Sequence, residues 1–173
     1  MILGENIYLD AVRYKDLEKI LFWRNNPIVY QWFYEHEPTA IEQQIKWYEN
    51  ILTKNDEKFW SINLLRTGEI IGVIGLIHID WRNRKAEFGR FFIFPQEYIH
   101  IGLGKEALQL LIDYFFNHMN MHKLYCDTFS DNIPAIKLYE KIGFVQTGLF
   151  KEHIYRKGKY EDLIYFELTK GKN

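Results

Sequence analysis

A glycine-bearing turn is the first feature of this sequence that could do chemistry, because it could hold a phosphate. It lies at 94–105, reads FPQEYIHIGLGK and precedes a long stretch with apolar residues at helical spacing. Gly102 and Gly104 would let the backbone approach a ligand, while the unpaired N–H groups of a first helical turn favour an anion, to which Lys105 adds positive charge. The stretch is neither a Walker nor a Rossmann motif, since Gly-Lys-Ser/Thr and a third glycine are missing. A G-x-G pair also opens many helices only to make a tight turn, so a structural interpretation stands beside phosphate binding.

Three ionisable residues, His78, Asp80 and Glu87, fall within stretches rich in β-branched and aromatic residues. Side chains alternate along a strand, so we expect positions 76, 78 and 80 to share one face. A metal site is not expected, because His78 has no second ligand at a useful spacing. Cys126, the only cysteine, lies in an expected strand without a neighbouring base and is interpreted as a buried core residue.

The elements that must position these residues follow from the period of the apolar pattern, which changes between helical and alternating along the chain. We expect helices over Lys15–Trp23, Thr39–Lys54, Leu103–Met119 and Pro134–Ile142, and strands over Asn6–Val12, Lys58–Leu65, Ile70–Trp81, Lys85–Phe94 and Lys123–Phe129, with two more strands around the turn at 157–159. The order β-α-α-β-β-β-α-β-α-β-β predicts an α/β fold with an antiparallel meander followed by a βαβ unit, which is right-handed by default. We expect a mixed central sheet of six to seven strands with helices on both faces.

Length and charge restrict the function classes. At 173 residues the chain is expected to form one domain, 1–173. The 22 basic and 23 acidic residues nearly cancel, which disfavours nucleic acid as a partner. A single cysteine excludes an internal disulfide, and the sequence lacks a secretory signal and an apolar run of about 18 residues. We therefore expect a cytoplasmic protein without a membrane partner.

A second motif, NIPAIKLYEKIGF at 132–144, turns these features into a family resemblance. Its pattern N-x-x-A-x-x-L-Y-x-x-x-G-F is similar to the late motif of Gcn5-related (GNAT) N-acetyltransferases, and the glycine turn resembles their pyrophosphate loop, [RQ]-x-x-G-x-[GA]. The likeness includes the strands IIGVIGLIHID and AEFG and covers most of the chain. Within the family, the sequence resembles the RimJ/RimL-like branch. It departs at Ile99, which stands at the Arg/Gln position, in a loop about one residue longer than usual.

The resemblance implies the GNAT fold, a bacterial acyltransferase activity and acetyl-CoA as co-substrate, with no metal. The residues it implies for CoA binding are Phe92, Ile93, Phe94, Ile101, Gly102, Leu103, Gly104, Lys105 and Asn132. Tyr139 matches the tyrosine taken as general acid toward the leaving thiolate. A phenol suits that task because its pKa, about 10, keeps it protonated at neutral pH. Outside the motif, Tyr139 would be interpreted as a core residue.

Direct attack by an amine needs a neutral nucleophile, so a general base is expected near the thioester. Glu87 is the first candidate, with His78 and Asp80 as alternatives. The competing interpretation is that Glu87 is a structural partner for Arg24, Arg82 or Arg90.

The resemblance implies a small molecule with a primary amine as the acceptor, and two classes of acceptor compete. LFWRNNP at 21–27 resembles acetyltransferases that act on nucleotide-linked amino sugars of the pseudaminic acid pathway, in which Trp23 would stack and Arg24 would contact a phosphate. The same segment with WFYEHE at 32–37 resembles spermidine acetyltransferases, in which Glu35 would pair with a polycation, and His78 is a further expected contact. Protein N-terminal acetyltransferases share the opening as well. A homodimer, and a shell that binds acyl-CoA without turnover, are further hypotheses.

Overall fold

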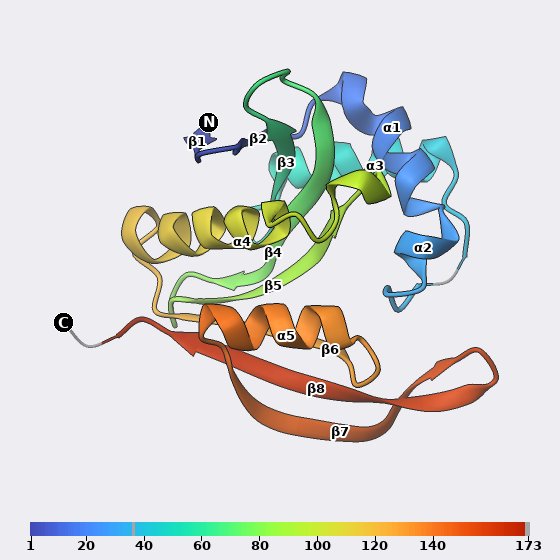
Figure 1. Ribbon diagram of the computed structural model, residues 1–173, viewed down its shortest axis with the longest axis vertical. Coiled ribbons are helices and arrows are strands. Elements are labelled where there is room, and N and C mark those ends of the chain that lie inside the picture. Colours follow the sequence, from blue (N-terminus) through green and yellow to red (C-terminus); the bar gives the residue numbers. More distant parts are fainter. Residues whose placement is uncertain (36, 172–173) are drawn as a thin grey trace.

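The computed structural model describes residues 1–35 and 37–171 of the chain. Its centre is an eight-stranded sheet in the order β1-β2-β3-β4-β5-β6-β8-β7 (Figure 1). The strands are β1 (Ile2–Leu3), β2 (Ile7–Ala11), β3 (Lys58–Leu64), β4 (Ile70–Asp80), β5 (Lys85–Ile93), β6 (Lys123–Phe129), β7 (Val145–Arg156) and β8 (Lys159–Thr169). The predicted α/β fold is confirmed, but the predicted six to seven strands were too few, because the two-residue β1 is too short to show an alternating pattern.

The helices cover both faces of the sheet, as predicted (Figure 1). They are α1 (Leu17–Arg24), α2 (Pro27–Tyr30), α3 (Ile41–Thr53), α4 (Leu103–Asp113) and α5 (Ile133–Ile142), with single 3-10 turns η1 (Tyr14–Asp16) and η2 (Gln96–Tyr98) and a π-helical turn η3 (Tyr114–His118). Among the described residues, no helix combines the length and the apolar character that a membrane crossing requires.

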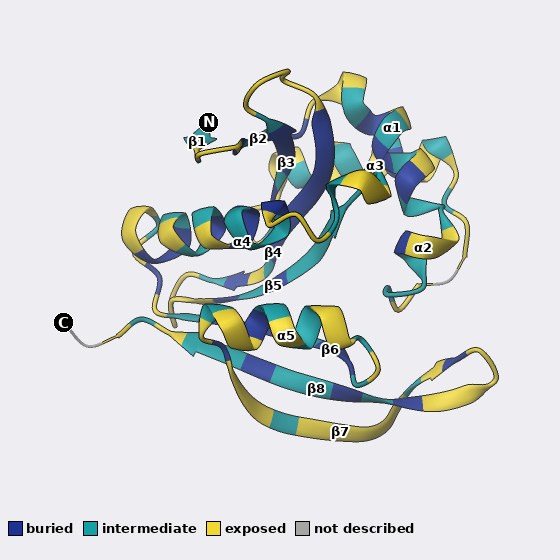
Figure 2. Cartoon of the chain, viewed as in Figure 1, coloured by how far each residue is buried: buried dark blue, intermediate teal, exposed yellow. Residues whose placement is uncertain are grey.

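Two apolar clusters, one on each face, hold the sheet between the helices. On one face the buried residues of α4, with Leu103, Ala107 and Leu111 at helical spacing, pack on β4, β5 and β6. On the other face α1, through Leu17 and Trp23, packs with α3 against β3 and β4. Because β4 lies between the two clusters, it is buried over most of its length, whereas the edge strand β7 is largely exposed (Figure 2).

The parallel pair β5 and β6 is short, and this shapes the site. The recorded ladder joins Lys85–Glu87 to Lys123–Tyr125, although β5 continues to Ile93 and β6 to Phe129. Beyond Glu87 the described parts of the two strands are not paired with each other. Their facing backbone groups are therefore free to bond a ligand between them.

One local expectation was wrong. Positions 76, 78 and 80 do not share a face, because a bulge between Ile77 and Asp80, where His78 has a φ of 50°, breaks the alternation. Leu76 and Ile79 consequently both join the α4 cluster. After α1 ends at Arg24, Pro27 starts α2, where the side chain of Asn26 accepts from the N–H of Ile28 at 3.0 Å.

Candidate active site

The glycine turn ends in an open helix N-terminus. Gly102 caps α4 with a φ of 97°, a conformation that favours glycine. Among the described residues, its chain neighbours apart, no atom lies within 4 Å of the place where its Cβ would be. The first helical bond runs from the Glu106 N–H to the Gly102 carbonyl at 3.1 Å. The N–H groups at 103–105 come before the first helical donor, Glu106, so they have no acceptor within the helix and can bind an anion, which fits the diphosphate of CoA.

The loop before α4 accommodates the departure from the family pattern. Residues Gln96–Tyr98 form η2, Ile99 is extended, and His100 has a φ of 66° just before the left-handed Gly102. Ile101, an expected CoA contact, is 62% exposed at the mouth of this loop. The extra length of the loop therefore lies before the N–H groups at 103–105 in the sequence.

Tyr139 lies on the inner face of α5, beneath the point where β5 and β6 part. Its ring is 8% exposed and packs edge-on against Phe88 of β5 and Phe166 of β8, with centroids 5.8 Å and 5.6 Å away. Burial raises the pKa of the Tyr139 phenol well above 10, and the nearby Cys126 and Asp127 add to that shift. The phenol therefore keeps its proton at neutral pH and can donate it to a ligand atom.

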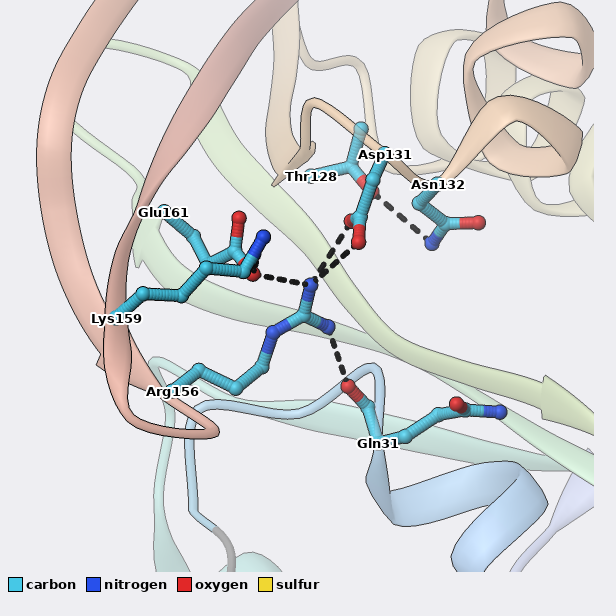
Figure 3. Close-up of polar contacts among 7 residues, drawn as sticks. All are labelled: Gln31, Thr128, Asp131, Asn132, Arg156, Lys159 and Glu161. Atoms are coloured by element: carbon cyan, nitrogen blue, oxygen red, sulfur yellow. Dashed lines mark hydrogen bonds and ion pairs between the residues drawn. The ribbon is translucent and has the colours of Figure 1, made fainter.

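Asn132 is the N-cap of α5. Its Oδ1 accepts from the Ala135 N–H at 3.4 Å. Its Nδ2 donates to Thr128 Oγ1 at 3.1 Å (Figure 3). The side chain thus fixes the start of the helix that carries Tyr139. Its expected contact with CoA remains a prediction.

Glu87 is paired with His78 and not with the arginines considered for it. His78 Nδ1 lies 2.8 Å from Glu87 Oε2, and the Glu87 side chain is 19% exposed. Burial raises the pKa of Glu87, an effect that the bond to His78 partly offsets. Asp80, the other alternative, instead accepts from Asn83 in the turn after β4, and this bonding lowers its pKa. The role of Glu87 as the general base remains a prediction.

Asp127 and Tyr34 are residues of this site that the sequence interpretation missed. Asp127 alternates on β6 with the core residues Leu124 and Cys126, so it points to the same face as Tyr125. The Tyr34 hydroxyl, from the chain after α2, donates to its Oδ1. Burial raises the pKa of Asp127, while the bond from Tyr34 lowers it. The signal that could have found Asp127 is the one used for Glu87, a carboxylate inside a strand.

Aromatic rings surround the two carboxylates. Tyr165 of β8 is the register partner of Asp127 and stacks on Tyr125 at 6.0 Å with an interplanar angle of 16°. Phe150 of β7 meets Tyr165 edge-on at 5.4 Å. Burial, followed by the charges of Glu87 and Asp127, raises the pKa of Tyr165 to about 12. Carboxylates and ring faces together are a chemistry that recognises cations.

The remaining expected acceptor residues divide between core and surface. Trp23 is 2% exposed and packs on Phe92 and Phe94, so its position favours a core role over stacking on a substrate. Arg24 pairs with Glu35 at 2.7 Å, and Glu35, 64% exposed, also faces Arg90 at 3.9 Å. His36, in the same acidic stretch, lies outside the described residues.

Comparisons with known proteins agree with this geometry. An acetyltransferase (GNAT) domain model matches residues 6–145. The spermidine N(1)-acetyltransferase of Escherichia coli K12 is 28% identical over 161 residues, covering 93% of this chain and 84% of the relative. YokL, an uncharacterised N-acetyltransferase of a Bacillus subtilis prophage, is 28% identical over 167 residues, which are 96% of this chain and 92% of that protein.

Solved structures extend the likeness to the whole fold. The crystal structure of the Vibrio cholerae spermidine N-acetyltransferase in complex with CoA and spermine has a TM-score of 0.88, with 28% identity over 95% of both chains. Another structure of that enzyme, a dodecamer in an intermediate state, has a TM-score of 0.81. These relatives support the polyamine alternative over the nucleotide-linked amino sugar that was expected first. With the family model matching most of its length, the chain belongs to the acetyltransferase (GNAT) domain family and is an acetyl-CoA-dependent N-acetyltransferase.

Proposed function

We propose that this enzyme acetylates a primary amine of a polyamine such as spermidine. The observation that carries the proposal is the pair of half-buried carboxylates, Glu87 and Asp127, which face the opening between β5 and β6 beside the stacked rings of Tyr125 and Tyr165. Burial raises the pKa of both acids, and a bound ammonium group would offset the desolvation of their charges. Relatives that are named spermidine acetyltransferases support the same class.

The residues divide the work across the opening. The N–H groups at 103–105 bind the diphosphate of acetyl-CoA, which supplies the acetyl thioester, while those backbone groups at 92–94 that do not pair with β4 bond the arm that leads to it. Glu87 takes a proton from the attacking amine, directly or through a water. As the new N–C bond forms and the thioester C–S bond breaks, Tyr139 donates its proton to the departing sulfur. Solvent then returns the proton from Glu87 to the phenolate.

The opposite placement of acid and base supports this division. Tyr139 packs on Phe88 from the α4 side, and Glu87, the neighbouring residue on β5, has its side chain on the other face. A thioester between the strands would have the phenol on its sulfur side and the carboxylate on its amine side. The protonated phenol then acts on the sulfur, and the carboxylate acts on the amine nitrogen of the same reaction.

The test is turnover of defined amines by the purified protein. Acetyl-CoA is mixed with spermidine, spermine or putrescine, free CoA is followed with a thiol reagent, and the acetylated product is identified by mass spectrometry. A nucleotide-linked amino sugar and a peptide with a free N-terminus are the comparison substrates. We expect the polyamines to react fastest. Turnover of the sugar or the peptide without turnover of any polyamine would contradict the proposal.

Thermal shift separates binding from turnover. A ligand at about 100 times its dissociation constant stabilises the folded state by roughly 2.7 kcal/mol. We expect CoA and spermidine each to raise Tm. A rise with CoA, combined with inertness toward every amine tested, would instead support the acyl-CoA-binding module.

Self-association is part of the proposal. The C-terminal hairpin exposes several large apolar and aromatic side chains, and they are Val145, Leu149, Phe150, Tyr155 and Tyr160. An apolar edge strand of this kind needs cover in water. Light scattering coupled to size exclusion is expected to give a mass above that of the 21.0 kDa chain, and a monomer at every concentration would oppose it.

A further inference from the structure

Arg156, at the end of β7, carries a guanidinium group that is 2% exposed. Figure 3 shows it at the meeting point of three segments. Its Nη1 donates to the Gln31 carbonyl at 2.7 Å, and its Nη2 donates to both Asp131 oxygens at 2.9 Å and 2.8 Å and lies 3.4 Å from Glu161 Oε1. The guanidinium carbon also lies 3.8 Å from the centroid of the Phe129 ring.

Stability alone does not account for this arrangement. Removing a charge from water is costly, and replacing buried ion pairs by apolar residues is often neutral or stabilising. Here the cation is buried while Asp131 is 53% exposed, and among the described residues Arg156 Nε is buried without a hydrogen-bond partner. Burial of the guanidinium is therefore weak evidence for a stabilising role, and what its contacts do achieve is geometric.

The contacts join the two sides of the proposed active site. Gln31, 125 residues away in sequence, ends α2 and leads into the acceptor segment, defined here as residues 31–35, which carries Tyr34 and Glu35. Asp131 directly precedes Asn132, the N-cap of the helix that carries Tyr139. Hence one side chain touches both the chain that approaches Asp127 and the turn that starts the catalytic helix.

The acceptor segment depends more on Arg156 than the helix does. Its other long-range polar contacts run through the exposed side chains of Tyr34 and Glu35. Its apolar ones are two edge-on ring pairs, Phe33 on Phe92 at 6.1 Å and Tyr34 on Phe129 at 5.6 Å. The β6–α5 turn has further anchors, because the Ser130 N–H bonds the Asp162 carbonyl at 3.0 Å and Asn132 caps the helix. Loss of the guanidinium should therefore loosen the acceptor segment first.

We propose that Arg156 is a positioning residue that fixes the acceptor segment against the β6–α5 turn, and so sets the affinity for the amine without binding it. This rests on the proposed function only for the identity of the amine. The test compares Arg156→Met, which keeps length and removes the donors, with Arg156→Lys, which keeps the charge and loses the fork. Lys159→Met is the matched control, because Lys159 also pairs with Glu161, at 3.2 Å, but is 68% exposed.

Steady-state kinetics well below each Tm give the first measurement. A hydrogen bond to a charged group is worth enough to predict that KM for spermidine rises about tenfold in Arg156→Met, with KM for acetyl-CoA within about twofold of wild type. Arg156→Lys is expected to restore part of the change, and Lys159→Met to behave as wild type. An unchanged KM for spermidine in folded Arg156→Met would overturn the proposal, as would an equal rise in both KM values.

Amide hydrogen exchange gives a measurement that needs no activity. We expect residues 32–35 to exchange about tenfold faster in Arg156→Met, with α4 unchanged. If the wild type acetylates no polyamine, the proposed function fails while faster exchange at 32–35 still supports the positioning role. Unchanged exchange at 32–35 overturns that role whatever the substrate proves to be.

Discussion

His78 Nδ1 reaches Glu87 Oε2 at 2.8 Å because a bulge in β4 turns the imidazole out of the strand's regular alternation, toward the neighbouring β5. The histidine is 67% exposed and the carboxylate 19%. A solvent-facing imidazole thus touches the base from outside. It adjusts the pKa of Glu87 downward against the burial that raises it.

Replacing Glu87 by Gln should remove the base and leave the packing intact. General-base catalysis contributes typically 10²–10⁴-fold, so we expect kcat/KM for spermidine to fall by at least about 100-fold. CoA binding, measured by calorimetry, should not change. A fall of less than about threefold, too small for a general base, would assign Glu87 to substrate orientation instead.

Replacing His78 by Ala should move the acid limb of the pH–rate profile. The carboxylate accepts a proton only when ionised, so kcat/KM falls as pH drops through the pKa of Glu87. Because the bond to His78 lowers that pKa, its loss raises it, and the limb moves to higher pH. If the acid limb stays in place or moves to lower pH, the pH–rate profile does not report the pair of Glu87 and His78.

Tyr139→Phe tests the general acid in a variant that keeps the aromatic ring. The ring keeps its contacts with Phe88 and Phe166, and only the hydroxyl is lost. We expect kcat to fall about 100-fold, the lower range for a general acid, with Tm and CoA affinity unchanged. A normal kcat would show that water protonates the sulfur. A large drop in Tm would show that the hydroxyl has a structural role.

The local sequence pattern predicted the helices and strands well where the residues that determine an element lie within it. The bounds of β6 were predicted at both ends, and Gly143, with a φ of 113°, stops α5 as a left-handed residue should. In both cases the signal lies within the element itself. The same holds for Gly102 at the start of α4.

The contacts on the acceptor side of the site could not be predicted from local pattern, because they join residues far apart in the sequence. Tyr34 and Asp127 are 93 residues apart, and Arg156 and Gln31 are 125 apart, so no periodicity joins them. The bulge at His78 also escaped, because an alternating pattern does not reveal one extra residue. Family resemblance placed Tyr139 and Gly102 but says little about side chains that the motifs do not contain.

Gly102→Ala tests the diphosphate site through backbone strain. A left-handed φ costs a residue with a Cβ about 1–2 kcal/mol, and open space around the position excludes a clash as the cause. Gly158→Ala is the control, since that glycine has a φ of 82°, is equally open and lies in the β7–β8 turn. Both variants should lose similar stability on denaturant unfolding. Only Gly102→Ala should raise KM for acetyl-CoA. A rise in both variants would show that the change in KM does not come from the diphosphate site.

Asp127→Asn should separate stability from substrate recognition. Burial raises the pKa of Asp127 above 3.8, so between that value and the folded pKa the folded protein binds more protons than the unfolded chain. Stability therefore falls as pH rises through this window, and the loss persists at neutral pH. Asparagine accepts the bond from Tyr34 without a charge, so Tm at neutral pH should rise while KM for spermidine increases by about tenfold, the loss of one charge-assisted contact. A Tm that falls in the variant, or an unchanged KM, would mean that Asp127 serves Tyr34 and not the amine.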